Sequence, residues 1–405
     1  MSFEVRPIVT GAEAARSERF PALDGFRALA MLSVFFFHAW LPVSQMVFAK
    51  AHLFPGVIWR GNSVIVNFDT GVAMFFALSG FLIYRPFVAA HLEPRPEPKL
   101  VSYARRRALR IYPAYWLIFL VLLASGDFVH ITPTQVVVNL ALVQTWFNFS
   151  LHSGIGQAWT LVVEVAFYVF VPLWATLVRY ASRGRNRARC ELAGALLLTA
   201  VGFGASALDA AHGSPTWFKV FLPHLAALAP GMLLAIISVQ SGRDERARQR
   251  CTRIARYAVL WWSAAAVVFW IICAHVAANP YFTLNIHGLG WQEMLEPVVA
   301  ILMIAPLVLA PGPTGPLART LARRPIAWIG TISFGAYLWH ARILDLDVVQ
   351  SIIRHHGSGR GYPAIITGTL LALTLTVIAG AASWYCVEQP LLRLGARWEH
   401  RHART

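Results

Sequence analysis

Residues 23–40, LDGFRALAMLSVFFFHAW, form an apolar run that carries two strongly polar side chains, Arg27 and His38. In an α-helix their eleven-residue spacing is a rotation of about 1100°, which places both within roughly 20° of one face. At about 1.5 Å of rise per residue they lie about 16 Å apart, roughly half of the ~30 Å hydrocarbon layer of a membrane. With Arg27 at one surface, His38 is predicted near the bilayer midplane. An ionisable side chain there marks a functional path and needs a partner.

The composition places the chain among membrane proteins. Its 405 residues are 57% hydrophobic and 13% charged, with a mean hydropathy of +0.55, which is too apolar for an ordinary soluble domain. The net charge of +16 comes mostly from arginines in short clusters between apolar runs, a distribution that argues against nucleic-acid binding. The four cysteines have no CxxC spacing, so we expect reduced, structural thiols and no metal site.

Ten apolar segments predict an all-α membrane protein of about ten transmembrane helices without a soluble domain. Most of the 35 Lys and Arg residues fall in alternate connections and at the two ends, so the positive-inside rule predicts that both termini are cytoplasmic. We therefore expect a multi-pass protein of the inner, cytoplasmic membrane. Residues 1–20 are predicted as a cytoplasmic leader, 21–392 as the transmembrane domain and 393–405 as a basic tail; no cleavable signal peptide is expected. Segment 134–147 is too short for a span and is predicted to be re-entrant or interfacial. The ten predicted spans are 26–48, 71–90, 111–125, 158–178, 191–208, 218–239, 257–277, 291–310, 329–349 and 363–387.

Four polar side chains from four predicted spans are expected in one layer, slightly outside the midplane. These are His38, Ser79, Glu164 and His340. A carboxylate within a span costs about 2.5–3.5 kcal/mol on insertion scales, so Glu164 needs a partner or a cavity. The other three have a structural alternative, because an intramembrane His can be a packing residue and Ser79-Gly80 can be a small-residue helix contact.

A second group of polar residues is predicted at the cytoplasmic surface. Arg107 and Arg110, in the cluster Arg105-Arg106-Arg107-Ala108-Leu109-Arg110, share a face at i, i+3 spacing. The cluster is either a topology signal or, together with Arg27, an anion clamp, since guanidinium groups bind phosphates in bidentate fashion. An acyl-CoA has the shape that such a pair of sites would accept, with phosphates at one end and a thioester at the tip.

The sequence resembles the acyltransferase-3 family of integral membrane O-acyltransferases. LDGFR with Arg27 and His38 is similar to the basic-x10-His pattern of that family, and Arg107 to Arg110 match its RxxR. MFFALSGFLI at 74–83, WTLVVEVAFY at 159–168 and GTISFGAYLWH at 330–340 resemble three further family segments, in the expected order over nearly the whole chain. Phe26 and Phe334 replace the Leu and Tyr of the family patterns.

The resemblance implies transfer of an acyl group, often acetyl, from cytoplasmic acyl-CoA to a hydroxyl of an envelope carbohydrate or glycolipid. His38 is then the expected general base, with Glu164 orienting it or stabilising its charged form. His340, which matches a family segment, is the third expected catalytic residue. A variant in which His38 is itself acylated stays open. Arg27, Arg107, Arg110 and Ser79 are the expected donor-binding residues, with acetyl-CoA as co-substrate and no metal.

Two other classes of function compete with this interpretation. A proton-coupled transporter or flippase of an envelope precursor could use Arg27, His38 and Glu164 as a relay. It predicts an inverted repeat or broken helices in matching halves, and the sequence shows neither. A non-catalytic membrane partner of an envelope enzyme is the third alternative. The sequence leaves open the acceptor, the length of the donor acyl chain and the oligomeric state.

Overall fold

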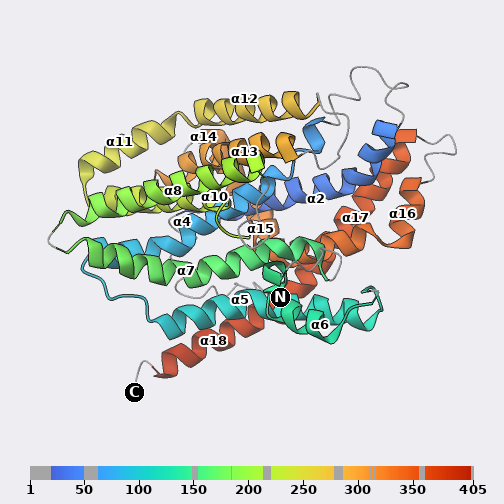
Figure 1. Ribbon diagram of the computed structural model, residues 1–405, viewed down its shortest axis with the longest axis horizontal. Coiled ribbons are helices and arrows are strands. Elements are labelled where there is room, and N and C mark those ends of the chain that lie inside the picture. Colours follow the sequence, from blue (N-terminus) through green and yellow to red (C-terminus); the bar gives the residue numbers. More distant parts are fainter. Residues whose placement is uncertain are drawn as a thin grey trace, which may run out of the picture.

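The computed structural model describes residues 20–49, 63–128, 130–147, 154–183, 185–212, 220–277, 286–310, 312, 315–354 and 361–402. Within these ranges all regular structure is helical, as predicted, and Figure 1 shows the long helices lying side by side along one common direction. The predicted leader 1–20 lies almost entirely outside the described residues.

Each of the ten predicted spans overlaps a helix, and the ninth, 329–349, overlaps two, Arg324–Leu344 and Asp347–Arg354. The helices are α2 (Ala22–Ala49), α4 (Thr70–Leu92), α5 (Leu100–Ala124), α6 (Pro133–Leu140), α7 (Trp159–Ala181), α8 (Arg187–His212), α10 (Leu225–Ser241), α11 (Glu245–Arg256), α12 (Ala258–Ala277), α13 (Ile286–Val308), α14 (Gly315–Leu321), α15 (Arg324–Leu344), α16 (Asp347–Arg354), α17 (Gly361–Ser383) and α18 (Gln389–His402).

Fewer helices are long and apolar enough to be membrane spans than the ten that the sequence predicts. Among the described residues six helices are long and apolar enough to cross a membrane, or seven if α11 and α12, which meet at 58°, form one broken span. Helix α10 and the apolar part of α13 are shorter, and α15 does not meet the same criteria. A multi-pass membrane protein is therefore supported, whereas ten spans stay a prediction.

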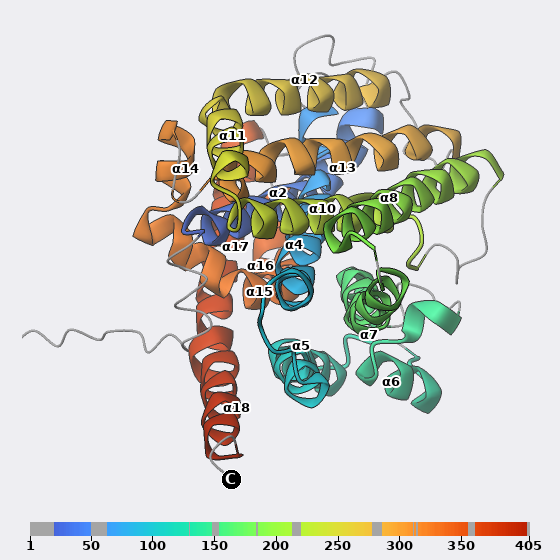
Figure 2. The ribbon, with the colours of Figure 1, turned by 90° about the vertical axis from the view of Figure 1, so that its left-hand side faces the viewer.

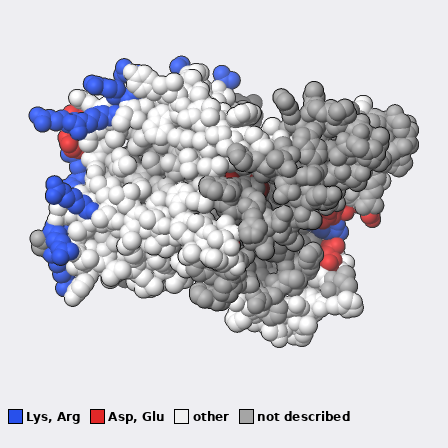
Figure 3. Space-filling view, turned by 45° about the horizontal axis from the view of Figure 1, so that its top comes forward, with Lys and Arg blue, Asp and Glu red and all other residues white. Residues whose placement is uncertain are grey.

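Basic residues gather at one end of the molecule. The α4–α5 and α7–α8 connections, helix α11 and the end of α18 all lie on the left of Figure 1, and Figure 3 shows Lys and Arg concentrated at that end. This arrangement is the one that a cytoplasmic face requires under the positive-inside rule. We call it the basic end below.

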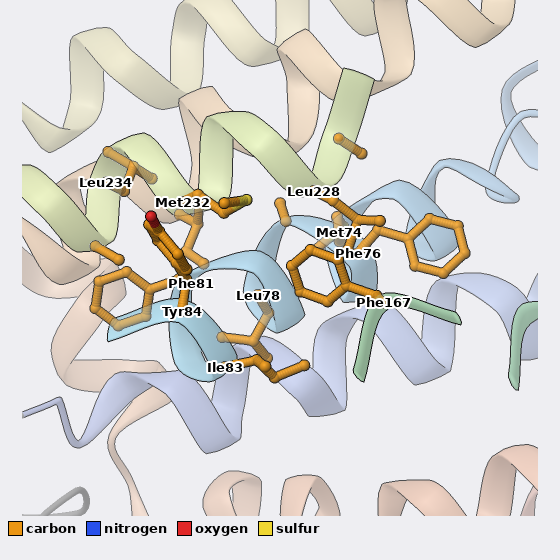
Figure 4. Packing of buried hydrophobic residues seen from close by; sticks show 14 of the residues in the cluster. Met74, Phe76, Leu78, Phe81, Ile83, Tyr84, Phe167, Leu228, Met232 and Leu234 are labelled. Atoms are coloured by element: carbon orange, nitrogen blue, oxygen red, sulfur yellow. The ribbon is translucent and has the colours of Figure 1, made fainter. Parts of the chain in front are cut away.

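Helix α4 occupies the centre of the bundle, in contact with α2, α7, α10 and α13, as the view from the basic end shows (Figure 2). Its side chains are buried on all sides, among them Phe81 and Tyr84, which pack with Met232 of α10 in Figure 4. A Cβ added at Gly80 would lie 2.0 Å from the Leu228 carbonyl oxygen, so only glycine permits this close crossing of α4 and α10.

The described part of the predicted basic tail, residues 393–402, is helical. A π-helical turn, Trp384–Glu388, joins α17 to α18, and α18 continues to His402 and packs on α5. The predicted tail 393–405 therefore begins as ordered helix. Helix α6, within predicted segment 134–147, has only eight residues, or about 12 Å at 1.5 Å per residue, and is too short to cross a membrane.

Candidate active site

One cavity of about 90 Å³ is lined by five of the seven side chains predicted to function, together with apolar residues. It is enclosed by α2, α4, α5, α7 and α15. The five predicted residues are Arg27, Ser79, Arg107, Arg110 and Glu164. We call this cavity the arginine pocket.

The arginine cluster of α5 is divided between two tasks. Arg105 and Arg106 form ion pairs with Glu399 of α18 at 2.6 Å and 3.0 Å, and the Arg105 guanidinium also stacks 4.0 Å from the Trp398 ring. Arg107 and Arg110 instead line the pocket. A signal for topology alone would not require this division, because any arginine at the basic end satisfies the positive-inside rule.

Carboxylates accompany the arginines in the pocket. Arg27 donates to Asp24 at 2.9 Å, one helical turn earlier in α2. Glu164 accepts a 2.6 Å hydrogen bond from Tyr168, four residues later in α7, and Arg107 lies 5.4 Å from the ring of the same tyrosine. The pocket therefore holds cations and anions together, which lowers the cost of burying either.

Ser79 and Gly80 have separate roles in α4. Ser79 lines the pocket, whereas Gly80 makes the close crossing with α10. The small-residue helix contact expected for Ser79-Gly80 is therefore made by Gly80. Ser79 is part of the pocket lining, where its side chain can contact a bound molecule.

His38 and His340 form a pair across α2 and α15. Their rings are edge-on with centroids 4.8 Å apart, and His38 Nδ1 lies 3.3 Å from His340 Nε2. His38 Nδ1 also contacts the Val34 carbonyl oxygen at 2.9 Å, and His340 Nδ1 contacts the Tyr337 carbonyl oxygen at 2.5 Å. His38 is half-buried and His340 is buried.

These contacts determine which nitrogen of each ring carries the proton. A carbonyl oxygen can only accept, so Nδ1 of both histidines is protonated and donates. His340 Nε2 then holds a lone pair that also accepts from His38 Nδ1. The lone pair of neutral His38 consequently sits on Nε2, which is the atom able to act as a base.

Tyr337 connects the histidine pair with the arginine pocket. It lines the pocket, its ring centroid lies 5.5 Å from that of His340, and its carbonyl oxygen binds His340. Its hydroxyl is hydrogen-bonded to Thr160 at 2.9 Å and to the Gln157 carbonyl oxygen at 3.1 Å. One buried tyrosine thus contacts both groups of residues.

The four residues predicted in one layer fall into two groups in the structure. Ser79 and Glu164 lie with the arginines, while His38 and His340 lie together behind Tyr337. The partner found for His38 is His340, and the hydrogen-bond partner found for Glu164 is Tyr168. Span order and rise per residue give depth in the membrane but not the direction in which a side chain points.

Several polar residues of this site were not predicted from the sequence. Asp24 precedes Arg27 by three residues and Tyr168 follows Glu164 by four, so helical spacing could have indicated both. Tyr337 precedes His340 by three residues. Glu388, discussed below, had no such signal.

Polar residues also meet where α5 and α15 end, away from the basic end. The Arg342 Nε donates to Asp127 at 3.0 Å. A hydrogen bond from Ser125, together with Arg342, holds the pKa of the Asp127 carboxyl below its usual range. Asp345 directly follows α15, and its carboxylate interacts electrostatically with Arg342 and with His38. His38 therefore lies within electrostatic reach of this cluster.

Among the residues that the structure describes, no group of three or more His, Cys, Asp or Glu side chains has the arrangement of a metal site.

Comparison with known proteins identifies relatives over nearly the full length. The sequence profile of the family described as "Acyltransferase domain" matches residues 20–387. The acyltransferase MdmB of Streptomyces mycarofaciens is 26% identical over 94% of this chain and 94% of its own length. YrhL of Bacillus subtilis is 25% identical over 93% of this chain and 55% of its own length. The peptidoglycan O-acetyltransferase OatA of Listeria monocytogenes is 22% identical over 93% of this chain and 56% of its own.

The chain thus spans about half the length of the latter two relatives. No solved structure matches significantly.

Proposed function

The chain belongs to the acyltransferase domain family, and from that premise we propose that it is a membrane O-acyltransferase. In this proposal it moves an acyl group, acetyl in the first instance, from cytoplasmic acyl-CoA to a hydroxyl of an envelope carbohydrate or glycolipid. The observation that carries the proposal is the joining of the arginine pocket to the His38–His340 pair through Tyr337. An anion site beside a base suits a donor with phosphates at one end and a thioester at the other.

The donor is held by Arg27, Arg107 and Arg110 in this proposal. Guanidinium groups form charge-assisted bidentate hydrogen bonds with phosphate oxygens. Asp24, bonded to Arg27, and Glu164, in the pocket lining, balance the arginines, and the phosphates of the donor take over part of that balance on binding. The cavity of about 90 Å³ is small beside an entire CoA, so in this proposal it accepts only the phosphate-bearing part that the arginines contact.

His38 acts as the general base. Its Nε2 takes the proton of the acceptor hydroxyl while the hydroxyl oxygen attacks the thioester carbonyl carbon. The carbon–sulfur bond then breaks, an ester is formed, and the CoA thiolate receives the proton from His38. His340 Nε2 accepts from His38 Nδ1–H throughout, and so fixes the ring as a carboxylate does in a catalytic triad.

The acceptor is proposed from chemistry and from relatives. OatA of Listeria monocytogenes carries peptidoglycan in its name, and a polysaccharide or glycolipid hydroxyl of the envelope is the corresponding acceptor for this chain. The cluster of Asp127, Arg342 and Asp345 lies on the side where such an acceptor would approach His38.

The test is release of CoA thiol by the purified protein in vesicles supplied with acetyl-CoA. We expect thiol release that depends on an added envelope glycan extract, together with an acetyl ester on the glycan. The variant H38A, folded as judged by its thermal midpoint, should lose both signals. Movement of an envelope precursor across the vesicle membrane without thiol release would instead support the transporter.

A further inference from the structure

Glu388 is a buried carboxylate that the proposed mechanism does not use. It is 3% exposed and lies at the end of the π-helical turn Trp384–Glu388 between α17 and α18. An ionised carboxylate is costly to bury without a partner. Turns of this kind are rare and occur mostly at functional sites.

The π turn is what aims this carboxylate. Ser383 donates to Glu388 Oε1 at 2.9 Å across five residues. In an α-helix, residues five apart are rotated by about 140° and cannot meet on one face. The wider turn brings both side chains to the same side of the helix, and that side faces α15. A Cβ added at Gly335 of α15 would lie 3.0 Å from Glu388 Oε1, so the carboxylate rests against the α15 backbone.

Arg110 of α5 lies within electrostatic reach of this carboxylate. Helix α5 packs on the π turn, and Arg110 lines the arginine pocket. The neighbours of Gly335, Ser333 and Phe334, line the same pocket. Glu388 therefore lies next to residues of the pocket wall, within electrostatic reach of one of its three arginines.

We infer that Glu388 is a positioning residue that holds the Arg110 guanidinium toward the phosphates of the donor, with the π turn and Ser383 fixing its carboxylate. The inference rests on the proposed function, because it assigns Arg110 to an acyl-CoA. Glu388 contacts neither the donor nor the reacting atoms and acts through Arg110 alone.

A second glutamate of the same segment supplies a matched control. Glu399 of α18 also pairs with α5, but its partners Arg105 and Arg106 lie outside the pocket. Loss of either glutamate removes one carboxylate between the C-terminal segment and α5. Only loss of Glu388 releases an arginine of the pocket.

The experiment measures acetyl transfer by E388Q, E388D, E399Q and the unaltered protein across a range of acetyl-CoA concentrations. For E388Q we expect the KM for acetyl-CoA to rise about tenfold, equivalent to about 1.4 kcal/mol, with kcat changed less than about twofold. E388D keeps the charge and should recover part of the affinity. E399Q should keep the unaltered KM, even if its thermal midpoint falls. S383A should raise the KM less than E388Q.

The inference is overturned if E388Q has the KM of the unaltered protein, if its KM falls, or if E388Q and E399Q raise KM equally. If E388Q does not fold, the KM values of S383A and E399Q for acetyl-CoA are compared instead. The inference is then overturned if S383A does not raise KM above that of E399Q. Failure of the proposed function looks different, because the unaltered protein would then show no acetyl transfer.

Discussion

At the scale of single residues, Nε2 of His38 carries the proposed chemistry because the Val34 carbonyl fixes the proton on Nδ1. We expect H38Q to lower the rate of acyl transfer by about 10²–10⁴-fold, the usual contribution of a general base. Binding of CoA should stay within about twofold, since His38 does not line the pocket. H340Q should lower the rate by less, because His340 acts on the reaction only through His38. Initial rates of acyl transfer at saturating donor measure the effect of both substitutions. An H38Q variant with the rate of the unaltered protein would contradict the role of His38 as general base.

A second prediction at this scale concerns the Asp127–Arg342 ion pair. The hydrogen bond from Ser125 and the charge of Arg342 hold the pKa of Asp127 below its value of 3.8 in an unfolded chain. A depressed pKa contributes stability above pH 3.8, and this contribution is lost as the pH falls through the lower, folded value. D127N should therefore be less stable at neutral pH, by at most about 1 kcal/mol for a surface pair.

Thermal midpoints in detergent between pH 3 and pH 7 test this second prediction. The difference between the unaltered protein and D127N should shrink toward the acid end. A difference that grows on acidification would show that the sign is wrong.

The residues that could be predicted from the sequence are those whose chemistry is conspicuous in a membrane. Arg27, Glu164 and His38 stand out because a charged or ionisable group in an apolar run is expensive. Tyr168 stands out only through its i, i+4 spacing from Glu164, and Tyr337 does not stand out, because tyrosine is a common residue in such helices. Their roles depend on side-chain direction, which the sequence does not specify.

At the scale of helices, buried hydrogen bonds join α4, α7 and α8 at the basic end. Tyr84 donates to Glu191 at 2.6 Å, His91 Nδ1 contacts the same carboxylate at 2.6 Å, and His91 Nε2 lies 3.0 Å from Ser182 Oγ. All four side chains are buried. This group stands apart from the arginine pocket and is expected to serve stability.

Replacing Glu191 tests that role. E191A leaves Tyr84 and His91 buried without their partner, and such losses cost about 3–5 kcal/mol. We expect a clear fall in the thermal midpoint in detergent, with kcat per folded molecule unchanged. C190A, at the adjacent half-buried position, is the control and should stay close to the unaltered protein. An E191A midpoint equal to that of C190A would contradict the prediction.

Helix positions follow from the apolar pattern, and helix ends and irregularities do not. Helix α5 begins at Leu100, eleven residues before predicted span 111–125, because the arginine-rich segment continues the helix and is held there by Glu399. The π turn before Glu388 depends on packing between α15 and α17, and no local pattern in the sequence announces it.

At the scale of the whole molecule, the account requires the basic end to be cytoplasmic and the His38 side to face the envelope. Helix α11 lies at the basic end, and Asp127 follows the far end of α5 (Figure 1). In a variant without the four native cysteines, R248C and D127C place single thiols at opposite ends. A membrane-impermeant thiol reagent added to intact cells should label D127C and spare R248C. Labelling of R248C alone would reverse the proposed direction of transfer.

The central claim is that the arginine pocket binds the phosphates of an acyl-CoA. Equilibrium binding of CoA is measured for the purified unaltered protein and for the R107Q/R110Q double variant. R106Q is the control, because Arg106 pairs with Glu399 outside the pocket. The account predicts that the unaltered protein and R106Q bind CoA alike and that R107Q/R110Q binds at least about tenfold more weakly, a loss of about 1.4 kcal/mol or more. Equal binding by all three proteins, or no binding by any of them, would contradict it.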